Sequence, residues 1–358
     1  MRRVLLLGNA DTKRTVYLKK AAAQMEIPVE LQEWKDWNRQ LPEGELFLKI
    51  DPPLWESWSL KQLRTLTEEY RRHLTETEQA AENRHIEFFN TPSVISELLD
   101  KRRCKKRLIQ AGLPVTELLC ENNEADPAFD AAPGRNQKAG VQSTEQLLER
   151  MRQRKISQVF VKPVSGSGAA GVSAFRIQPG TGRMSLYTCA YETSDTGLAN
   201  TKKLRQYTDP KKAVKILDKL FELDCVVERW YPKAAHNGYT YDLRVVLQEQ
   251  RIDYVLARLS KGPITNLHLN NHPLSVEELN LPARTVESVE ELCRMAADCF
   301  PGLRCAGIDI LLEKGSLKPR IIEMNAQGDL IYQDIYHENI IYRRQAERMK
   351  AWLSSAYF

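Results

Sequence analysis

The sequence has few of the features that mark disulfide-bonded, zinc-binding or membrane-spanning proteins. Its seven cysteines include no closely spaced pair, which argues against a disulfide framework and a cysteine zinc site. An odd number of cysteines is typical of a reducing compartment, so we expect a cytoplasmic protein. The first apolar run, residues 4–7, is too short for the core of a signal peptide, and no later run could cross a membrane.

The chain also lacks a strong charge of one sign. Its net charge of +5 over 358 residues is compatible with anionic ligands but gives no argument for nucleic acid as a partner. Basic residues concentrate at 101–107, KRRCKKR. Such a run usually forms the solvated face of a helix, and a nucleic-acid patch is the less favoured alternative. Gly8 is the only glycine in the first strand–helix turn, so the dinucleotide-binding fingerprint is absent.

The first quarter of the chain alternates short apolar runs with helical stretches. The expected elements are strands at 4–7, 29–31, 46–50 and 86–89 and helices at 12–25 and 60–81. Continuous apolar runs are typical of buried parallel strands. The alternation therefore predicts an N-terminal βαβ domain over residues 1–92, with a doubly wound parallel sheet.

Beyond residue 92 we expect two α+β units, a smaller one over 93–224 and a larger one over 225–358. The first begins with a single helix at 93–112, between a serine N-cap and a glycine C-cap. Residues 121–140 are rich in Asn, Asp, Ala, Pro and Gly, which predicts a mobile insertion. A strand is expected at 113–119 and a polar loop at 195–209.

A glycine-rich stretch, VKPVSGSGAAGV at 161–172, follows a predicted strand that carries Lys162. Small residues such as Gly166, Gly168 and Gly171 let backbone N–H groups approach phosphate oxygens. The spacing is not that of a Walker loop, and no helix follows. We interpret the stretch as a strand–loop–strand flap over phosphates; a plain structural turn is the alternative.

The stretch at 305–329 predicts a hairpin that turns at 314–318. A turn centred on Ser316 places Asp309 opposite Glu323, where like charges repel, and puts Asn325 on the same face. The opposite, apolar face would carry Ile308, Ile310, Leu312, Ile322 and Met324. An oxygen-only set of two carboxylates and an amide favours Mg²⁺. Solvated acids on an outer face are the alternative.

Two basic residues belong to a second predicted pair of strands. In the strand at 239–248, Asp242 and Arg244 share one face. The strand at 252–259 follows as its hairpin partner and ends at Arg258.

These motifs in this order resemble the ATP-grasp superfamily, in particular its RimK-like and glutathione-synthetase-like carboxylate–amine ligases. The segments are DPP at 51–53, DK at 100–101, FVKPVSGSGAAGV at 160–172, VVERWY at 226–231, DLR at 242–244, ITNLH at 264–268, GIDIL at 307–311 and IIEMN at 321–325. The resemblance implies the ATP-grasp fold, in which an N-terminal domain precedes two α+β subdomains that clamp ATP.

The resemblance also implies roles for individual residues. Phosphate contacts would come from Lys101, Lys162, Ser165, Gly166, Ser167, Gly168 and Gly171. The adenine site would use Glu228 for the amino group and Arg229, Trp230 and Tyr231 at the hinge. Arg244, Arg258 and Lys162 would be catalytic, and Asn266 would support the site. Asp309, Glu323 and Asn325 would bind two Mg²⁺ ions, for which Mn²⁺ can substitute. One position departs from the family, because Lys233 lies where a ribose-binding acid is usual.

The implied activity is ATP-dependent formation of an amide bond through an acyl phosphate, on an amino acid or peptide substrate. Two alternatives stay open: an ATP-dependent kinase on the same scaffold, and a nucleotide-binding protein without catalysis. A fold alone does not separate them. The sequence also leaves open whether the chain forms a homo-oligomer.

Overall fold

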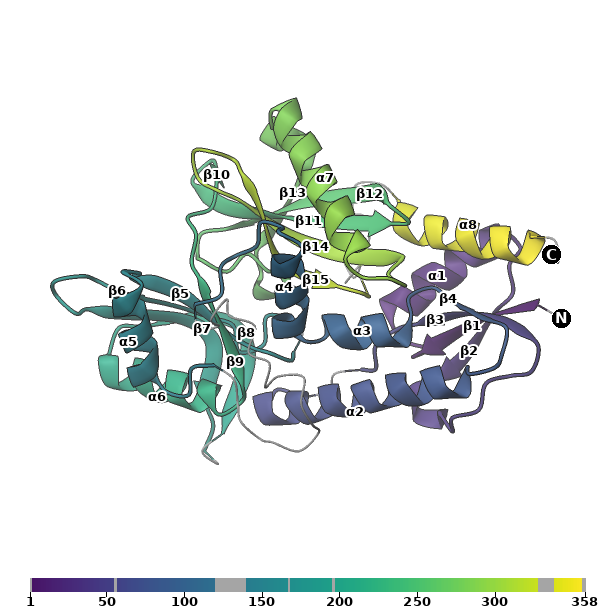
Figure 1. Ribbon diagram of the computed structural model, residues 1–358, viewed down its shortest axis with the longest axis horizontal. Helices are drawn as coiled ribbons and strands as arrows, with labels where there is room; N and C mark the ends of the chain where they lie inside the picture. The colour runs from purple at the N-terminus through teal and green to yellow at the C-terminus, as the bar shows by residue number, and fades with distance from the viewer. Residues whose placement is uncertain are drawn as a thin grey trace.

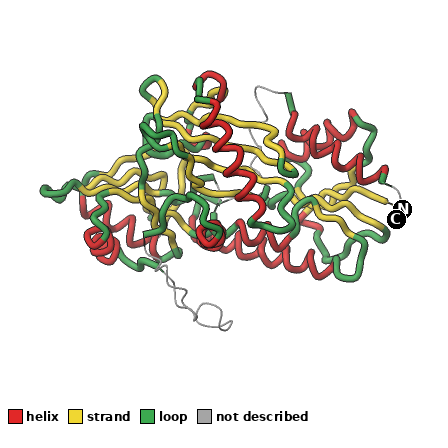
Figure 2. The backbone as a smooth tube through the Cα atoms, turned by 45° about the horizontal axis from the view of Figure 1, so that its top comes forward, coloured by secondary structure: helices red, strands yellow, loops and turns green. Residues whose placement is uncertain are grey.

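The computed structural model describes residues 2–54, 57–119, 140–166, 168–194, 197–327 and 338–355. Three β-sheets lie along the long axis of the molecule, with helices packed against them (Figures 1 and 2). The mixed α/β class predicted from the sequence is confirmed. No helix in these ranges is long and apolar enough to span a bilayer.

The N-terminal sheet is parallel, with strand order β2-β1-β3-β4. Its elements are β1 (Arg2–Gly8), α1 (Lys13–Gln24), β2 (Val29–Glu33), the short helix η1 (Trp34–Asp36), β3 (Glu45–Ile50), α2 (Leu60–Ala80) and β4 (Ile86–Phe88). β1 and β3 are almost wholly buried, as their continuous apolar sequences predict. The last helix, α8 (Ile340–Ser354), returns to this domain and packs beside α1 (Figure 1).

The central sheet is antiparallel in order β13-β12-β11-β14-β15, and a short strand, β10, adds to β11. Its elements are β10 (Ala235–His236), β11 (Tyr239–Gln248), β12 (Arg251–Ser260), η3 (Leu267–Leu269), β13 (His272–Ser275), η4 (Val276–Leu279), α7 (Ala283–Asp298), β14 (Cys305–Leu312) and β15 (Pro319–Asn325). α7 packs on β11, β14 and β15. Every residue of β14 is buried, so the strand that carries Asp309 is fixed on both faces.

The third sheet is antiparallel in order β8-β7-β6-β5-β9. Its elements are α5 (Thr144–Gln153), β5 (Gln158–Pro163), β6 (Ser173–Ile177), β7 (Met184–Glu192), β8 (Leu198–Tyr207), α6 (Pro210–Phe221) and β9 (Cys225–Arg229). The prediction of a polar loop at 195–209 is wrong for most of that segment, because β8 pairs with β7 there. β8 is an edge strand, and its charged side chains face solvent. β9 pairs with β5, so a division of the chain by sheets falls after Arg229.

The single helix expected at 93–112 is two helices, α3 (Pro92–Leu98) and α4 (Lys101–Gln110). The break is at Asp100, which leaves helical geometry with φ −106° and ψ 103°. Its carboxylate accepts hydrogen bonds from the N–H groups of Arg102 and Arg103, at 2.9 and 3.0 Å, and so caps α4. Asp100 is thus the N-cap of a second helix. The sequence did not reveal this start because the basic run that follows Asp100 was read as part of one continuous helix.

Residues 113–119 do not form the expected strand. The segment makes only isolated bridges, Val115 to Ile321 and Leu118 to Glu228. It therefore joins the central sheet to the third sheet rather than extending either. The insertion expected at 121–140 lies outside the described residues, apart from Gly140.

Candidate active site

A cavity of about 480 Å³ lies where the three sheets meet. The parallel sheet supplies Asp51, and α4 supplies Lys101 and Lys105. The third sheet, the central sheet and the loops that leave them supply further lining residues: Lys162, Gly166, Gly168, Glu228, Arg229, Tyr231, Lys233, Asp242, Arg244, Arg258, Asn266, Asp309, Glu323 and Asn325. Segments far apart in the sequence thus converge on one space, where most of the predicted site residues lie.

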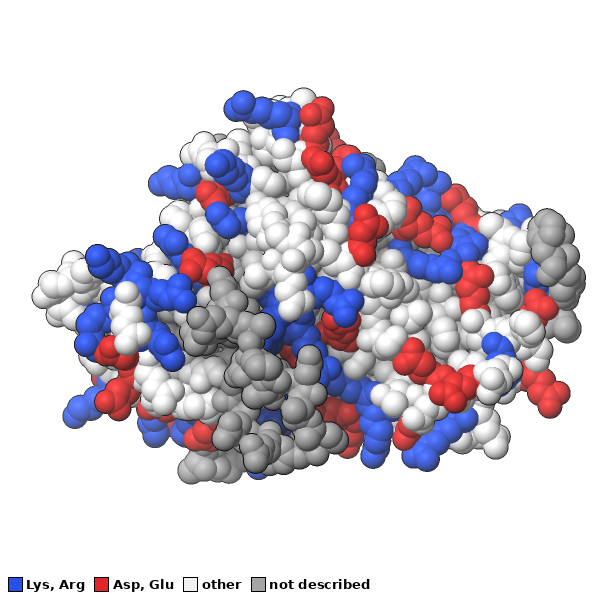
Figure 3. Space-filling view, viewed as in Figure 1, with Lys and Arg blue, Asp and Glu red and all other residues white. Residues whose placement is uncertain are grey.

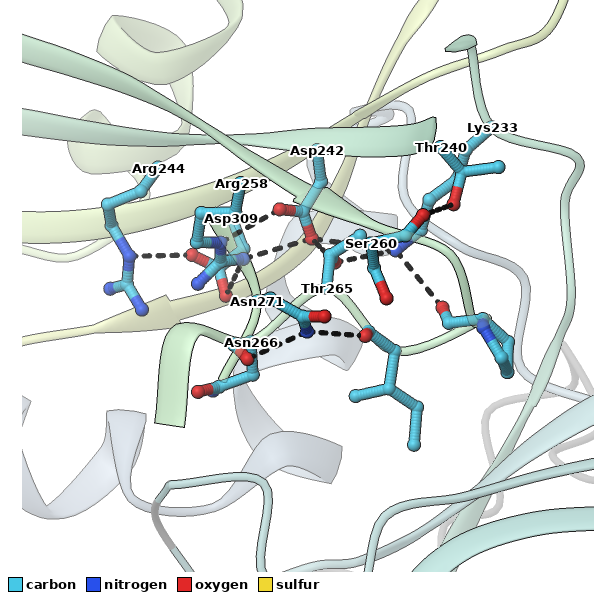
Figure 4. A network of polar contacts seen from close by, with 12 residues as sticks. Lys233, Thr240, Asp242, Arg244, Arg258, Ser260, Thr265, Asn266, Asn271 and Asp309 are labelled. Carbon is cyan, nitrogen blue, oxygen red and sulfur yellow. Dashed lines mark hydrogen bonds and ion pairs between the residues drawn. The ribbon is translucent and has the colours of Figure 1, made fainter. Parts of the chain in front are cut away.

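A chain of arginine–carboxylate contacts crosses the central sheet (Figure 4). Asp242 on β11 lies opposite Arg258 on β12, and the arginine donates to both carboxylate oxygens at 2.8 and 2.9 Å. The same guanidinium lies 2.9 Å from an oxygen of Asp309 on β14. Arg244 on β11 lies opposite Asp309, with Nε 2.8 Å from its Oδ1. The two arginines predicted to be catalytic are therefore held by carboxylates of neighbouring strands.

Two buried atoms in this network have no hydrogen bond within the described part of the chain: Nη1 of Arg244 and Oδ1 of Asp309. The ion pair between Arg244 and Asp309 is close, but its geometry is not that of a hydrogen bond. A buried donor without an acceptor is costly. Because both residues line the cavity, a ligand there can satisfy both atoms.

The register of the acidic hairpin is confirmed: Asp309 pairs with Glu323, and Gly307 with Asn325. A bulge between Asp309 and Ile310 then shifts the pairing by one residue, so Ile310 faces Ile321. The prediction that Ile322 belongs to the core is therefore wrong; Ile321 is fully buried, and Ile322 lines the cavity. The bulge leaves the carboxylate pair at the site intact.

The two opposed carboxylates have different electrostatic surroundings. Burial raises the pKa of Asp309 despite Arg244 and Arg258, and Glu323 adds to the rise. Burial also works to raise the pKa of Glu323, but Lys101 and Lys162, with the two arginines, lower it overall. Within the residues that the structure describes, the Glu323 carboxylate makes no hydrogen bond and no ion pair, whereas Asp309 is held by both arginines.

The donor set of this hairpin fits Mg²⁺. Asp309, Glu323 and Asn325 all line the cavity and offer only oxygen ligands from the carboxylates and the amide carbonyl. In the described ranges no group of three or more His, Cys, Asp or Glu side chains forms a metal cluster. Two carboxylates and an amide make an incomplete shell, as is usual for Mg²⁺ that shares its ligands with phosphates and water.

A second buried cluster surrounds Glu228. Lys105 and Lys162 place their ammonium groups 2.8 and 2.9 Å from its two oxygens, and the Thr116 hydroxyl donates to it at 2.6 Å. Only 2% of Glu228 and 3% of Lys105 are exposed. The expectation that residues 101–107 form a mostly solvated face is therefore wrong for two members, since Arg102 is buried as well. Figure 3 shows basic side chains gathered around α4 on this face.

The pKa values of the cluster follow from burial and charge pairing. Burial works to raise the pKa of Glu228, but Lys105 and Lys162 lower it to about 2. Burial lowers the pKa of Lys105 to about 8, although Glu228 opposes this shift. For Lys162, burial is outweighed by Glu228, Glu323 and Asp309, and its pKa is raised. Lys162 is thus the more firmly charged of the two lysines.

The glycine-rich loop closes one side of the cavity. Lys101, the first residue of α4, donates from Nζ to the carbonyl oxygen of Gly166 at 2.9 Å. Gly168 and Gly171 have φ values of +63° and +72°, which glycine adopts without strain. At Gly171 a Cβ would lie 2.8 Å from Pro163, so this position needs glycine for space too. Ser165 is partly buried beside Gly166, and Ser167 lies outside the described residues.

The hinge after β9 has only part of its predicted arrangement. Arg229 and Tyr231 line the cavity, and Trp230 does not. The Trp230 N–H donates to Gln158 at 3.2 Å, and its carbonyl accepts from the Gln158 side chain at 3.0 Å. The Trp230 ring contacts Phe160 with ring centroids 5.4 Å apart. Its backbone polar groups are therefore used to fasten the hinge to β5.

Lys233, where the family usually has an acid, is buried at the end of the network beyond Asp242, on the right of the view in Figure 4. Its Nζ donates to Thr265 at 2.7 Å and lies 3.6 Å from Asp242. Thr265 also donates to Asp242. Asn266 caps the short helix η3 through its side chain, which accepts from the His268 N–H at 2.9 Å. The Lys233 ammonium group thus helps to hold Asp242, which in turn positions Arg258.

Four residues of the site were not predicted: Lys105, Thr116, Asp242 and Thr265. Asp242 could have been found, since its alternation with Arg244 on β11 was recognised and Arg258 lies near the end of the partner strand β12. Lys105 was concealed within a run of six basic residues around Cys104, in which charge gives no sign of burial. Thr116 carries no sequence signal, and Thr265 has none beyond its place in the segment ITNLH, because only their contacts with charged neighbours give them a role.

The fold was compared with known proteins. No protein-family profile and no curated protein sequence matches the chain. The structure is similar to that of the D-cycloserine synthetase DcsG, with 12% identity and a TM-score of 0.58 over 97% of this chain and 99% of that chain. It is also similar to the ATP-grasp ligase PsnB solved with a minimal precursor, Mg and ADP, with 13% identity and a TM-score of 0.57 over 98% of each chain.

A third similar structure is the macrocyclase MdnC from Microcystis aeruginosa MRC, bound with the precursor peptide MdnA. It has 13% identity and a TM-score of 0.58 over 98% of this chain and 99% of that chain. All three likenesses extend over nearly the full length of both chains, and at such identities they establish the architecture. The chain therefore has the ATP-grasp fold.

Proposed function

We propose that the protein is an ATP-dependent carboxylate–amine ligase that forms an amide bond through an acyl phosphate. The observation that carries the proposal is the set of charges around one cavity. Arg244, Arg258 and Lys162 converge with the opposed carboxylates of Asp309 and Glu323. Phosphoryl transfer depends mainly on positioning and on neutralising charge, which this arrangement supplies.

The nucleotide would lie between the third sheet and the central sheet. Basic side chains outnumber acidic ones in the cavity lining, which favours a polyanion such as a triphosphate. Lys101 and Lys162 would contact the phosphates, together with Ser165 and the glycine loop at 166–171. Arg229, Tyr231 and the Glu228 carboxylate would form the adenine end, with Trp230 holding the hinge on Gln158.

The arginines would bind the group that is transferred. Arg258 is oriented by its two hydrogen bonds to Asp242, so its direction is set before a ligand arrives. Arg244 keeps Nη1 buried without an acceptor in the described residues, which suits an incoming phosphate or carboxylate oxygen. Asn266, as the cap of η3, would keep that loop against the site.

Asp309, Glu323 and Asn325 would hold Mg²⁺, which when bound neutralises phosphate charge. We propose two ions, for which Mn²⁺ can substitute. The proposed reaction has two steps. The substrate carboxylate attacks the γ-phosphate of ATP, and ADP leaves. An amine then displaces phosphate from the acyl phosphate. An acyl phosphate hydrolyses in water, so the glycine loop beside Lys101 would shield it.

The substrates we propose are an amino acid or a peptide, in a cytoplasmic protein. Support for a peptide comes from PsnB and MdnC, whose structures contain a precursor or precursor peptide. A homo-oligomeric state is a separate proposal, which sedimentation at several protein concentrations would test.

Calorimetry with Mg²⁺ and a non-hydrolysable ATP analogue would test nucleotide binding. A matrix of carboxylates and amines, assayed for ATP consumption and analysed by mass spectrometry, would identify the reaction. We expect a product whose mass equals acid plus amine minus water, with ADP and free phosphate. A stable phosphoester would identify a kinase instead, and the absence of nucleotide binding would refute both.

A further inference from the structure

A crevice opens in the N-terminal sheet where its strand order reverses. In the order β2-β1-β3-β4, the connection after β1 leads to one side of the sheet and the connection after β3 leads to the other. In open parallel sheets, ligands bind at this point beyond the carboxyl ends of the strands. We call the space between residues 9–14 and 51–54 the β1–β3 crevice. Residues from both segments line the main cavity.

The two walls of the crevice are held together. A Cβ added to Gly8 would lie 3.3 Å from the Cβ of Asp51, so the strand ends approach closely. The side chain of Asn9 donates to the carbonyl oxygen of Pro52 at 3.1 Å. The Asp51 N–H donates to Leu7 at 2.8 Å, and the Trp34 indole donates to the Asp51 carbonyl at 2.8 Å. The position of Asp51 is therefore fixed by the fold.

Asp51 has an acceptor that the described part of the chain does not use. Only 4% of the residue is exposed, and it lines the cavity. One carboxylate oxygen pairs with Lys49, whereas Oδ2 is buried without a hydrogen bond in the described residues. A buried carboxylate oxygen without a donor is costly. A cationic N–H donor in the crevice would remove that cost.

The opposite wall has the complementary charge. It is the N-terminus of α1, a helix of 12 residues capped by Thr12, where backbone N–H groups and the helix dipole favour an anion. Lys13 and Arg14, the first two residues of this helix, also line the cavity. One wall thus suits an ammonium group and the other a carboxylate, and an α-amino acid carries both on one carbon.

The crevice is also linked to the acidic hairpin. Gln327, two residues beyond Asn325, donates to the carbonyl oxygen of Ile50 at 3.2 Å and also contacts Tyr70. Gln327 lines the cavity with Asp51. A ligand on Asp51 would therefore lie in the same cavity as Asp309 and Glu323, beside the residues that anchor the hairpin.

We propose that the β1–β3 crevice binds an α-amino acid as the amine substrate, with its ammonium on Asp51 Oδ2 and its carboxylate at the N-terminus of α1 beside Arg14. That the bound amino acid is a substrate rests on the ligase function proposed above. The binding site itself is inferred from the geometry of the crevice alone. Because Asp51 lines the main cavity, the amino group would lie in the same cavity as the acyl phosphate.

Calorimetry of the full chain with Mg²⁺ and a non-hydrolysable ATP analogue present would test it. Each of the twenty amino acids is titrated in turn, and the tightest binder is then compared with two analogues. One analogue lacks the amino group, as propionate does for alanine, and the other is the methyl ester. We expect both analogues to bind about 10- to 100-fold more weakly, because each loses a charge-assisted hydrogen bond. Equal binding of the analogue without an amino group would overturn the proposal.

Asp51→Asn should weaken amino-acid binding by about 10- to 100-fold and leave nucleotide binding unchanged. Because this single change would leave Lys49 buried beside an amide, the double variant K49M/D51N removes both charges and protects the fold. Arg14→Gln should lose discrimination between the amino acid and its methyl ester. Asp11→Asn, an exposed neighbour outside the cavity lining, is the control.

Wild-type protein that binds nucleotide but none of the amino acids would overturn the crevice proposal and leave the nucleotide site standing. Failure to bind nucleotide, with amino acids still bound in a manner dependent on Asp51, would refute the ligase and support the crevice. Unchanged amino-acid affinity in a folded D51N or K49M/D51N variant would overturn the crevice proposal in either case.

Discussion

Arg244 and Asp309 face each other across β11 and β14, with the arginine Nε 2.8 Å from a carboxylate oxygen. The same carboxylate also contacts Arg258, so a single buried acid holds both of the arginines that the central sheet contributes to the cavity. Asp309 therefore has two functions in the proposed enzyme. It positions the cations that would bind phosphate, and it would contribute to the proposed metal site with Glu323.

Asp309→Asn and Glu323→Gln should both abolish ATP turnover, but their effects on stability should differ. The asparagine removes the carboxylate that pairs with Arg244 and one of the two carboxylates that hold Arg258, at a cost of about 1–3 kcal/mol. The glutamine removes a carboxylate that repels Asp309 and has no ion pair in the described residues, so it should be neutral or slightly stabilising without metal. Thermal unfolding with and without Mg²⁺ would measure both.

The control for these variants is Asp298→Asn, at an exposed position on α7 outside the cavity. It should retain activity and melting temperature. If Asp309→Asn or Glu323→Gln consumed ATP as fast as the wild type, the metal assignment would be wrong.

Lys162→Ala should weaken nucleotide binding far more than Lys106→Ala. Lys162 is 5% exposed, lines the cavity and pairs with Glu228, whereas Lys106 is partly exposed outside the cavity lining. The loss of one buried phosphate contact should reduce affinity by about 10- to 100-fold. Calorimetry with a non-hydrolysable ATP analogue provides the measurement, and equal losses in the two variants would contradict the role of Lys162.

Glu228 should make the stability of the protein fall at acidic pH. Its pKa is lowered to about 2 in the folded state from an ordinary value of 4.5. A lowered carboxyl pKa stabilises the fold above the unfolded value, and that contribution is lost as pH falls from 4.5 towards 2. The gap in melting temperature between wild type and Glu228→Gln should therefore shrink between about pH 5 and pH 3.

An exposed acid on α2 provides the comparison, since Glu69→Gln should show no such narrowing. If the difference in melting temperature between wild type and Glu228→Gln stayed constant over this pH range, the ion pairs of Glu228 with its two lysines would not contribute to the stability of the protein.

Arg102→Ala should loosen the junction between α4 and the third sheet. The Arg102 guanidinium forms a two-pronged contact with Asp224, at 2.7 and 3.0 Å, and donates to the Cys225 carbonyl at 3.1 Å. Asp224 is partly exposed, so we expect a loss of about 1–3 kcal/mol rather than the full cost of a buried pair. Hydrogen exchange at β9 would report the loosening. Arg103→Ala, an exposed neighbour, should leave exchange unchanged.

Local patterns predicted much of the fold and the pairing of Asp309 with Glu323. The hairpin register that pairs Asp309 with Glu323 could be read from the sequence because a tight turn fixes which residues oppose each other. The buried strands β1 and β3 followed from unbroken apolar runs. Strand β8 was missed because an edge strand with solvated lysines has the composition of a loop.

The sequence by itself determined which residue types are available to the site and how neighbours on one strand or hairpin are arranged. Only the tertiary structure decided that Lys105 meets Glu228, that Arg244 meets Asp309, and that Asp51 lines the same cavity as the first residues of α1. These contacts join segments whose separation along the chain carries no periodic signal. Their energies depend on burial, which turns a lysine in a basic run from a solvated charge into a partner of a carboxylate.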